Sequence, residues 1–374
     1  MELKDEFFMK LAIKEAKKGL GKVSPNPVVG AVIVDPKTGE IIAKGYHGFY
    51  GGPHAEAVAI EKAGSQAKNK VLYVTLEPCC HYGKTPPCTE KIIKAGIKKV
   101  ICGIRDPNPV ARGGLEVLKK HGIEVRCGIL EEEVKYLTRF FLSGILRKRP
   151  WIIMKVAASL DGKIAVSTGD SKWITSVEAR KKGHYLRSIC DGIVVGKNTV
   201  LKDDPELTCR LVKGKNPIRF VLDTNLSLSP NYKVFNPSAP TILVCGKEAP
   251  KEKEIEFERL GVEVWRLPVK RGKVDLKTFC KMCYERGINS LLVEGGGQVH
   301  GSFVEENLVD EVFYFLGPLI IGDEEGIPAV KRRPLKALKD ALFLKRVKSK
   351  KYGNSYLIHG ITEEGTCLLS TPLK

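Results

Sequence analysis

EPCCHYGKTPPC, residues 77–88, gathers three cysteines in one short loop. An apolar run, VLYVTL, comes directly before this loop and predicts a buried strand, and the run that begins at Cys88 predicts a helix. Closely spaced thiols in a chain without a secretion signal are candidates for metal ligands rather than for disulfides. The stretch therefore indicates a metal site between a strand and a helix, and it leaves open which of Cys79, Cys80 and Cys88 hold the metal.

A histidine and a carboxylate upstream complete the pattern. In GGPHAEAVAIEKAG, residues 51–64, His54 and Glu56 stand two residues apart where a helix is expected to begin, so both side chains can point into one cavity. One neutral imidazole and two thiolates are three ligands for tetrahedral zinc, and an open fourth position for water is typical of a catalytic site. Zinc lowers the pKa of its bound water from about 15.7 toward about 7. A carboxylate that is not a ligand can then carry protons to a leaving amine, and Glu56 is placed for this role.

Two of the three thiols suit the metal better than the third. Cys79 directly follows the predicted strand and its Glu-Pro pair, and Cys88 begins the predicted helix, where backbone N–H groups and the helix dipole favour a thiolate. Neighbouring residues of a turning segment point in different directions, so we interpret Cys80 as a non-ligand, with His81 as an alternative ligand. The order H-x-E, P-C and a later cysteine is the signature of zinc nucleobase deaminases, although eight residues separate the two thiols here where the general pattern has two.

Length and composition predict a globular protein of two domains. The 374 residues exceed the size at which a single core usually stops growing, and 43% apolar and 28% charged residues are ordinary values for a globular chain. No apolar run is long enough to span a bilayer, and the start is expected to be a capped helix and not a cleaved signal, so we expect a cytoplasmic protein. The net charge of +19 attracts polyanions, but Lys and Arg are spread along the chain, which favours a lysine-rich surface over a nucleic-acid footprint.

Strand-like and helix-like runs alternate along both parts of the chain, which is typical of an α/β protein. The amphipathic stretch EEEVKYLTRFFLSGILRKRP leads to Pro150 and is the predicted boundary. The predicted domains are therefore residues 1–147 and residues 148–374. Near the end of the chain, VDEVFYFLG and NSYLIHG predict an antiparallel pair of strands that closes the second sheet.

The motifs of the first part resemble the deaminase half of the bifunctional riboflavin-biosynthesis deaminase/reductases, the RibD family. The resemblance rests on EPCCHYGKTPPC, on SPNPVVGAVIV at 24–34, on HAE at 54–56 and on IRDPNPVARGG at 104–114. The longer thiol spacing is the rule in that family. The resemblance implies a cytidine-deaminase-like three-layer domain that binds one zinc ion through His54, Cys79 and Cys88 and transfers protons through Glu56.

Two asparagines lie in Asn-Pro turns of these motifs. By the same resemblance, Asn26 matches the asparagine that helps to hold the pyrimidine, with a plain turn residue as its alternative. Asn108, in DPNP, is expected to be a turn residue. The reaction that the resemblance implies for this domain is hydrolytic removal of the 2-amino group of 2,5-diamino-6-(5-phosphoribosylamino)pyrimidin-4(3H)-one.

In the second part, SLLVEGGGQVHGSF at 290–303 sets a run of glycines between an expected strand and an expected helix. Bare N–H groups at a helix N-terminus can approach a phosphate. The spacing is not the dinucleotide pattern G-x-G-x-x-G, however, and a tight strand-to-helix turn gives the same sequence. Glu294 ends the expected strand, where open α/β sheets bind ligands, and its alternative is a helix-capping acid.

Four stretches of the second part resemble the reductase half of the same family, in the same order: KVAASLDGKIA, GDSKWIT, LRSICDGIVVGKNTVLKDDPELTCR and VEGGG. This half of the family is a dihydrofolate-reductase-like domain that uses NADPH to open and reduce a phosphoribosyl ring to a ribityl chain. By position, the resemblance places the cofactor contacts at Ala157, Trp173, Thr199, Asp203, Gly296, Gly297, Gln298, Val299, His300, Gly301 and Ser302. It places the substrate contacts at Ser171, Arg187, Leu207, Arg210 and Glu294.

The chemistry agrees with these residue types. Arg187 and Arg210 can each bind the substrate phosphate through a fork of N–H groups. Lys155 or Glu294 can protonate or polarise the sugar as hydride arrives at C1′. Trp173 lies in a polar segment and has a core position as its alternative.

The implied protein is a bifunctional enzyme with zinc and NADPH as cofactors and a small phosphorylated pyrimidine as substrate, without a nucleic-acid or membrane partner. The family is often oligomeric, which implies a homo-oligomer. A nucleic-acid deaminase is the rival enzyme class, since tRNA adenosine deaminases share H-x-E and P-C, but it leaves residues 151–360 without a role. A non-catalytic zinc module is the third class, and it predicts a fourth protein ligand.

Overall fold

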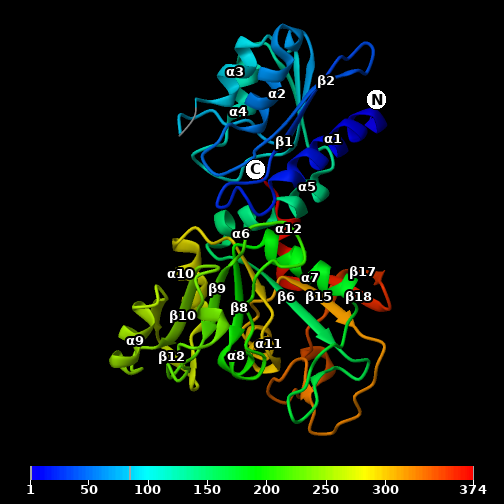
Figure 1. Cartoon of the computed structure of the whole chain (residues 1–374). Helices are drawn as coiled ribbons and strands as arrows, with labels where there is room; N and C mark the ends of the chain where they lie inside the picture. Colours follow the sequence, from blue (N-terminus) through cyan, green and yellow to red (C-terminus); the bar gives the residue numbers. More distant parts are fainter. Residues whose placement is uncertain (1, 84–85, 374) are drawn as a thin grey trace. The chain divides into compact units, whose positions relative to one another are not determined.

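The computed structural model describes residues 2–83 and 86–373, which form two compact units (Figure 1). Unit 1 comprises Met1–Lys148 together with Leu368–Lys374, and unit 2 comprises Arg149–Cys367. The C-terminal residues thus group with unit 1, where Lys135 donates a hydrogen bond from Nζ to the carbonyl oxygen of Thr371 (2.8 Å), whereas the predicted division assigns them to the second domain. Within the described residues, we find no helix whose length and apolar character would let it span a bilayer.

Unit 1 is built on a five-stranded sheet in the order β2-β1-β3-β4-β5. β1 runs antiparallel to β2 and β3, whereas β3, β4 and β5 are parallel. The strands are β1 Gly30–Val34, β2 Ile41–Tyr46, β3 Val71–Leu76, β4 Lys99–Ile104 and β5 Glu124–Cys127. The helices are α1 Glu2–Ala16, η1 Lys17–Gly19, α2 Ala55–Ala63, η2 Gly64–Ala67, α3 Cys88–Lys94, α4 Gly114–Lys120, α5 Glu131–Leu137 and α6 Arg139–Arg147.

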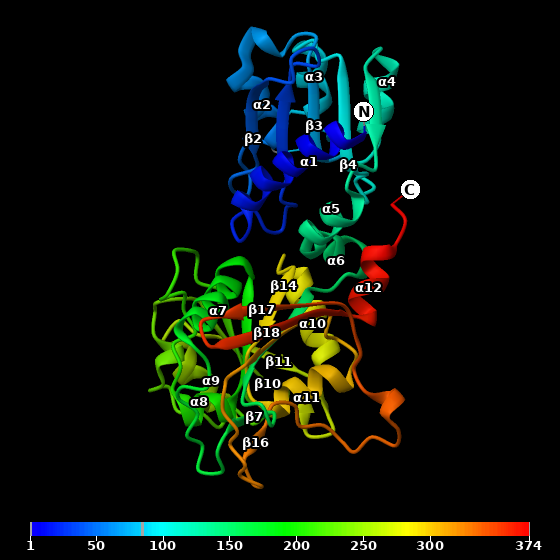
Figure 2. The same cartoon turned by 90° about the vertical axis from the view of Figure 1, so that its right-hand side faces the viewer.

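Two glycines let the helices of unit 1 approach this sheet closely. A Cβ atom at Gly30 in β1 would lie 2.1 Å from the carbonyl oxygen of Ala12 in α1, and one at Gly45 in β2 would lie 2.2 Å from that of Ala55 in α2. Because Ala31 and Gly45 are register partners, they share one face of the sheet, and Gly30 points to the other. α1 and α2 therefore cover opposite faces, as Figure 2 shows, and unit 1 has three layers. The close approach also places the start of α2, which carries the HAE motif.

Unit 2 is built on a nine-stranded sheet in the order β11-β10-β9-β8-β14-β6-β15-β18-β17. Neighbours from β11 to β15 are parallel, and β18 is antiparallel to both β15 and β17. The predicted antiparallel pair is confirmed as β15 and β18, but β17 lies outside it and forms the edge. The strands of this sheet are β6 Trp151–Ala158, β8 Gly192–Gly196, β9 Ile218–Leu222, β10 Thr241–Gly246, β11 Glu263–Leu267, β14 Ser290–Val293, β15 Glu311–Leu316, β17 Leu344–Tyr352 and β18 Ser355–Thr362.

Helices and short strand pairs complete unit 2. The helices are α7 Val177–Ile189, α8 Lys197–Asp203, η3 Lys233–Phe235, α9 Lys251–Glu258, α10 Leu276–Glu285, α11 Gly297–Glu305, η4 Leu338–Asp340 and α12 Glu363–Ser370, whose last residues belong to unit 1. The short strands are β7 Lys163–Ala165, β12 Val269–Lys270, β13 Lys273–Val274 and β16 Ile327–Pro328. In the core, the ring of Phe220 in β9 packs against Phe279 of α10 and Trp265 of β11, with centroids 5.2 and 5.5 Å apart. Complete burial of one such side chain stabilises the fold by about 1.5–3 kcal/mol.

Unit 2 begins with a buried ion pair. Arg149 donates from Nη1 to Oδ2 of Asp310 (2.8 Å) and from Nη2 to Oδ1 (2.9 Å), while the backbone N–H of Ile152 also donates to Oδ2 (2.8 Å). The Asp310 side chain is 0% exposed. Its charge is therefore compensated by the guanidinium and not by water.

We expect Arg149→Met to lower the free energy of unfolding of unit 2 by about 3 kcal/mol, because it leaves the Asp310 carboxylate buried without its counter-charge. Denaturant titration measures this loss. Arg333→Met is the matched control, since it removes an ion pair with Glu305 whose arginine side chain is 64% exposed, and we expect a loss of less than about 1 kcal/mol. Equal losses in the two variants would contradict the role of the buried pair.

Candidate functional site

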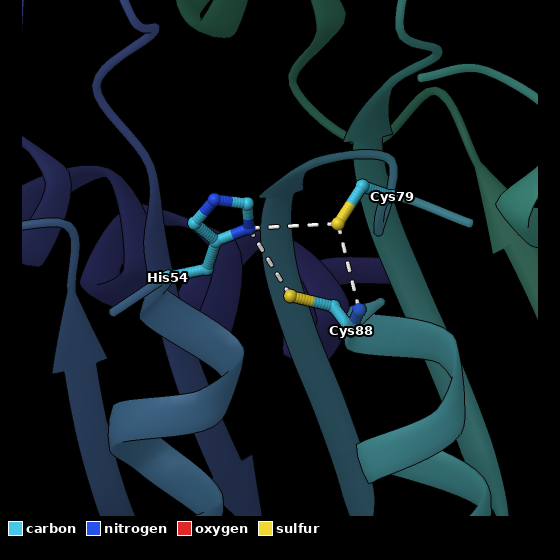
Figure 3. Close-up of side chains that lie close together, drawn as sticks. All are labelled: His54, Cys79 and Cys88. Atoms are coloured by element: carbon cyan, nitrogen blue, oxygen red, sulfur yellow. Dashed lines mark hydrogen bonds between the residues drawn. The ribbon is translucent and has the colours of Figure 1, made fainter. Parts of the chain in front are cut away.

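Three side chains from different elements converge in unit 1 (Figure 3). His54 lies immediately before α2, Cys79 follows the end of β3, and Cys88 is the first residue of α3. Nδ1 of His54 lies 3.5 Å from Sγ of Cys79 and 3.3 Å from Sγ of Cys88, and the three ligand atoms all lie within 4.8 Å of one another. Among residues 2–83 and 86–373, this is the one group of His, Cys, Asp and Glu side chains close enough to share a metal ion.

The spacing and chemistry of these side chains fit zinc. In a tetrahedral site with bonds of about 2.0–2.3 Å, a nitrogen ligand and a sulfur ligand lie roughly 3.5 Å apart, close to the separations found here. A hydrogen bond with Cys88 lowers the pKa of the Cys79 thiol to about 4, against the opposing effect of burial, so this group is the thiolate that a metal requires. The backbone N–H of Cys88 donates to the same sulfur (3.4 Å). Three protein ligands leave a fourth position for water.

Cys80 contacts a different part of the chain. Its thiol donates to the carbonyl oxygens of Ala111 (3.8 Å) and Arg112 (3.2 Å). The metal-ligand group among the described residues contains neither Cys80 nor His81. The closed site with four protein ligands that a structural zinc module needs is therefore not formed by the side chains next to Cys79.

Glu56 lies on the first turn of α2 and is only 3% exposed. Burial raises the pKa of its carboxyl to about 7, and the charge of His54 opposes this shift while that of Cys79 adds to it. A carboxyl with a pKa near neutrality can both take up a proton and return it, which general acid–base catalysis requires.

His47 joins this site, although no motif pointed to it. Its Nδ1 lies 3.0 Å from the carbonyl oxygen of Pro53, which can only accept, so Nδ1 carries the proton. Nε2 then accepts a hydrogen bond from Nδ2 of Asn26 (3.2 Å). The ring of His47 also packs edge-on against that of His54, with centroids 5.5 Å apart. The predicted pyrimidine-binding residue is thus oriented by a side chain that contacts a predicted metal ligand.

Glu294 connects the predicted substrate residues of unit 2. Arg187 donates to it twice, from Nε to Oε1 (2.9 Å) and from Nη2 to Oε2 (2.8 Å), and Nζ of Lys155 lies 3.6 Å from Oε2. Burial alone would raise the pKa of Glu294, but the charges of Arg187 and Lys155 outweigh burial and hold the pKa well below its ordinary value. The same cluster contains His184, which no motif selected and whose pKa is lowered to about 4 by burial and by the charge of Arg187.

The two predicted phosphate-binding arginines differ in their surroundings. Arg187 also donates from Nη1 to the carbonyl oxygen of Thr208 (3.1 Å), and its side chain is 13% exposed, so most of its fork is directed at protein atoms. The side chain of Arg210 is 51% exposed and pairs with Glu206 (2.6 Å). Between them, Leu207 is buried and has a φ of 55°, a strained conformation for a residue with a side chain.

The predicted cofactor loop has two kinds of glycine. Gly296 has a φ of 40°, and a Cβ atom there would lie 3.3 Å from Oγ1 of Thr199, so two predicted cofactor residues are neighbours. At Gly297 and Gly301, a Cβ atom would instead lie 2.2 and 1.8 Å from carbonyl oxygens of the segment 328–331. These two glycines therefore admit a neighbouring backbone and leave no room for a phosphate on that side of α11.

His300 belongs to the same packed side of α11. Its Nδ1 lies 2.9 Å from the carbonyl oxygen of Ala329 and its Nε2 lies 3.3 Å from that of Val293, so the ring is held in the core. Three other members of the predicted loop are less buried: Gln298, Val299 and Ser302.

The remaining predicted residues of unit 2 lie on separate elements. Trp173 is 67% exposed with the guanidinium of Arg180 3.8 Å from its ring centroid, so its alternative as a core residue is wrong. Ala157 lies on β6, and Asp203 ends α8. Burial raises the pKa of Asp203, and a hydrogen bond with Ser171 opposes this shift, which brings a predicted cofactor residue and a predicted substrate residue together.

The chain matches two protein families and many relatives. Residues 2–104 match the cytidine and deoxycytidylate deaminase zinc-binding region, and residues 150–358 match the RibD C-terminal domain. The chain is 44% identical to the riboflavin biosynthesis protein RibD of Aquifex aeolicus, over 95% of this chain and 97% of the relative. It is 40% identical to RibD of Bacillus amyloliquefaciens, over 96% of this chain and 97% of the relative.

Solved structures agree with these relatives. A diaminohydroxyphosphoribosylaminopyrimidine deaminase/5-amino-6-(5-phosphoribosylamino)uracil reductase from Thermotoga maritima superimposes with a TM-score of 0.85 at 43% identity, covering 96% of this chain and 99% of that chain. RibD of Acinetobacter baumannii superimposes with a TM-score of 0.86 at 33% identity, over 97% of this chain and 99% of that one.

These matches confirm the predicted fold class, a cytidine-deaminase-like domain followed by a dihydrofolate-reductase-like domain, and the resemblance on which it rested. They also support the predicted cofactors, zinc for the deaminase domain and NADPH for the reductase domain. The chain therefore belongs to the RibD family of riboflavin biosynthesis proteins, as an enzyme with a deaminase domain and a reductase domain.

Proposed function

We propose that this protein acts twice on one small phosphorylated pyrimidine, by hydrolytic deamination in residues 1–147 and by NADPH-dependent reduction in residues 148–374. The first substrate is 2,5-diamino-6-(5-phosphoribosylamino)pyrimidin-4(3H)-one, and the second step converts its ribosyl side chain to ribityl. The observation that carries the proposal is the convergence of one imidazole and two thiols beside the buried carboxyl of Glu56. The name of the Thermotoga maritima protein, a deaminase/reductase of such substrates, supports it.

In the deaminase domain, the side chains bind the substrate and move protons. Zinc, when held by His54, Cys79 and Cys88, supplies hydroxide from water at neutral pH. Glu56 takes a proton from the attacking water and passes it to the adjacent ring nitrogen, and the second water proton goes to the amino group, so that the C–N bond breaks, ammonia leaves and a carbonyl forms at the ring carbon. Asn26, oriented by its neighbouring imidazole, holds the pyrimidine.

Two residues of the reductase domain, Lys155 and Glu294, are the predicted candidates for protonating the sugar. We assign this role to Lys155. The bond from C1′ to the ring oxygen of the sugar breaks, that oxygen takes the proton, and C1′ takes a hydride, which NADPH supplies when bound. Glu294 is kept ionised by Arg187 and Lys155, so it has no proton to give at neutral pH and instead positions both cations. Because the fork of Arg187 is engaged by Glu294, the half-exposed Arg210 is the better placed of the two arginines for the substrate phosphate.

The start of α11 suits a phosphate of the cofactor. Its first N–H groups follow Gly296, and the hydroxyl of Thr199 lies beside that glycine. A helix N-terminus binds anions through its unpaired N–H groups and its dipole. Since the segment 328–331 covers the side that carries Gly297 and Gly301, we assign the phosphate to the end of the helix and not to its side.

The direct test is to supply the diaminopyrimidine phosphate with and without NADPH, and to follow ammonia and NADPH absorbance together. Ammonia release without NADPH, with NADPH consumed only after deamination, supports both halves of the proposal. RNA binding that falls steeply with salt, without NADPH binding, would favour a nucleic-acid deaminase. A homo-oligomer, a cytoplasmic location and the lack of nucleic-acid and membrane partners stay predictions from composition and resemblance.

We expect His54→Ala to lose bound zinc and ammonia release together, because two thiolates alone do not hold the ion at ordinary zinc concentrations. Reduction of the deaminated substrate should persist. Metal analysis and a coupled ammonia assay measure the two losses. His121→Ala, which changes an exposed histidine of the same unit, is the control. Full zinc content and full ammonia release in His54→Ala would show that the ligand assignment is wrong.

We expect Glu56→Gln to keep its zinc and to lower kcat of deamination by roughly 10²–10⁴-fold, since the amide cannot transfer the proton. NADPH-dependent reduction should be unchanged. Glu61→Gln, on the exposed side of the same helix, should have no effect on either reaction. Deamination by Glu56→Gln at the rate of the unaltered protein would remove Glu56 from the mechanism.

We expect Lys155→Met to lower kcat of reduction by roughly 10²–10⁴-fold with unchanged NADPH affinity, because methionine keeps the apolar stem but has no proton to donate. Stopped-flow NADPH absorbance and fluorescence titration measure the two quantities. Lys281→Met, whose lysine side chain is 73% exposed on α10, is the control. If Glu294→Gln abolishes reduction while Lys155→Met retains it, the two roles are the reverse of those proposed.

A further inference from the structure

Glu77 is a buried carboxylate next to the metal site that is not one of the ligands. Its oxygens accept three backbone hydrogen bonds, from the N–H of Asp106 to Oε2 (3.0 Å) and from those of Gly113 (3.1 Å) and Leu115 (3.0 Å) to Oε1. All three donors belong to residues 106–115, which comprise most of the connection between β4 and α4 and the first two residues of α4. A carboxylate that uses both oxygens on the backbone of one segment holds that segment in a single position.

The residues on either side of Cys79 contact the same segment. A Cβ atom at Gly114 would lie 1.8 Å from the carbonyl oxygen of Pro78, so α4 begins in direct contact with the ligand loop. The thiol of Cys80 donates to the carbonyl oxygens of Ala111–Arg112 (3.8 and 3.2 Å). The ligand is therefore flanked, before and after, by residues that bind residues 106–115.

This segment in turn covers the sulfur ligands. Ala111 forms a small buried cluster with Cys79 and Cys88, in which the three residues are 6%, 8% and 1% exposed. Loss of the segment's position would open both thiols to water and to competing ligands. The match to the deaminase zinc-binding region ends at residue 104, so the covering segment lies beyond it.

We propose that Glu77 is a positioning residue of the metal site, which ties residues 106–115 to the loop that carries Cys79 so that the tied segment shields the thiolates. Cys80 makes a second connection between the loop and this segment, through its hydrogen bonds to two carbonyl oxygens. The third cysteine of the loop thus has a role other than metal ligation. The inference rests on the proposed binding of zinc by His54, Cys79 and Cys88. It predicts an effect on how long zinc stays bound, because partners outside the ligand set commonly change metal affinity 10- to 100-fold.

The test measures zinc release from the purified protein to an excess of a chromogenic chelator. Glu77→Gln has nearly the same shape, but its amide group turns a donor toward a backbone donor. We expect release to be roughly 10–100-fold faster than from the unaltered protein. The visible absorption of the cobalt-substituted variant should be unchanged, which shows that the three ligands are still in place.

Three further substitutions test the same segment without changing a charge. Gly114→Ala forces the start of α4 away from Pro78 and should also speed zinc release. Cys80→Ala removes the second connection and should speed it, whereas Cys80→Ser keeps a donor for the two carbonyl oxygens and should restore the slow rate. If Cys80→Ser releases zinc as slowly as the unaltered protein, the faster release from Cys80→Ala comes from the lost hydrogen bonds and not from the lost side-chain volume.

Asp35→Asn is the control for general destabilisation. Asp35 also accepts backbone hydrogen bonds, from Lys37 (2.8 Å) and Thr38 (3.4 Å), but in a turn of unit 1 that contains no metal ligand. We expect Asp35→Asn to leave the rate of zinc release unchanged. This should hold even if Asp35→Asn lowers the melting temperature as much as Glu77→Gln does. Release from Glu77→Gln at the rate of Asp35→Asn would overturn the positioning role alone, while an unaltered protein that binds no zinc would overturn the proposed ligands and this inference together.

Discussion

The deaminase domain depends on bringing one imidazole and two thiols within 4.8 Å of one another in a mostly buried place. A hydrogen bond with Cys79, together with burial, raises the pKa of the Cys88 thiol, so both sulfurs become thiolates only when a cation lies between them. Several features of the chain serve this arrangement. Gly45 lets α2 approach the sheet, α3 begins at one of the ligands, and Glu77 ties down the segment that covers the sulfurs.

Two buried glutamates, one in each domain, have opposite pKa shifts because their surroundings differ. Glu56 has one imidazole and a thiolate for neighbours, and burial brings its pKa to about 7, where it can exchange protons. Glu294 is also buried, but two cations outweigh burial and keep it ionised. The same side chain is thus suited to proton transfer in one domain and to holding Arg187 and Lys155 in the other, which is the pattern by which carboxylates of one enzyme take different roles.

The glycines around the start of α11 have two different structural roles. A run of small residues between a strand and a helix is consistent with phosphate binding and with close packing, and here different glycines meet the two demands. Gly296 lies at the open start of the helix beside Thr199, while Gly297 and Gly301 admit the backbone of residues 328–331. The predicted substrate residue Glu294 and the predicted cofactor residue Gly296 therefore lie between the end of β14 and the start of α11, where open α/β sheets commonly bind ligands.

Local patterns in the sequence were enough to predict an α/β chain, the antiparallel strands β15 and β18, and a candidate metal site, because alternating apolar runs and ligand-type residues carry their chemistry in short stretches. The two fold types of the domains came from the family resemblance. Only the tertiary structure could show that Arg187, 107 residues from Glu294, uses its fork on that carboxylate, or that His47 orients Asn26. It also decided which glycines face a neighbouring backbone. The reason is physical: pairing, burial and the pKa shifts that follow from them are set by contacts between distant parts of the chain, which local spacing does not contain.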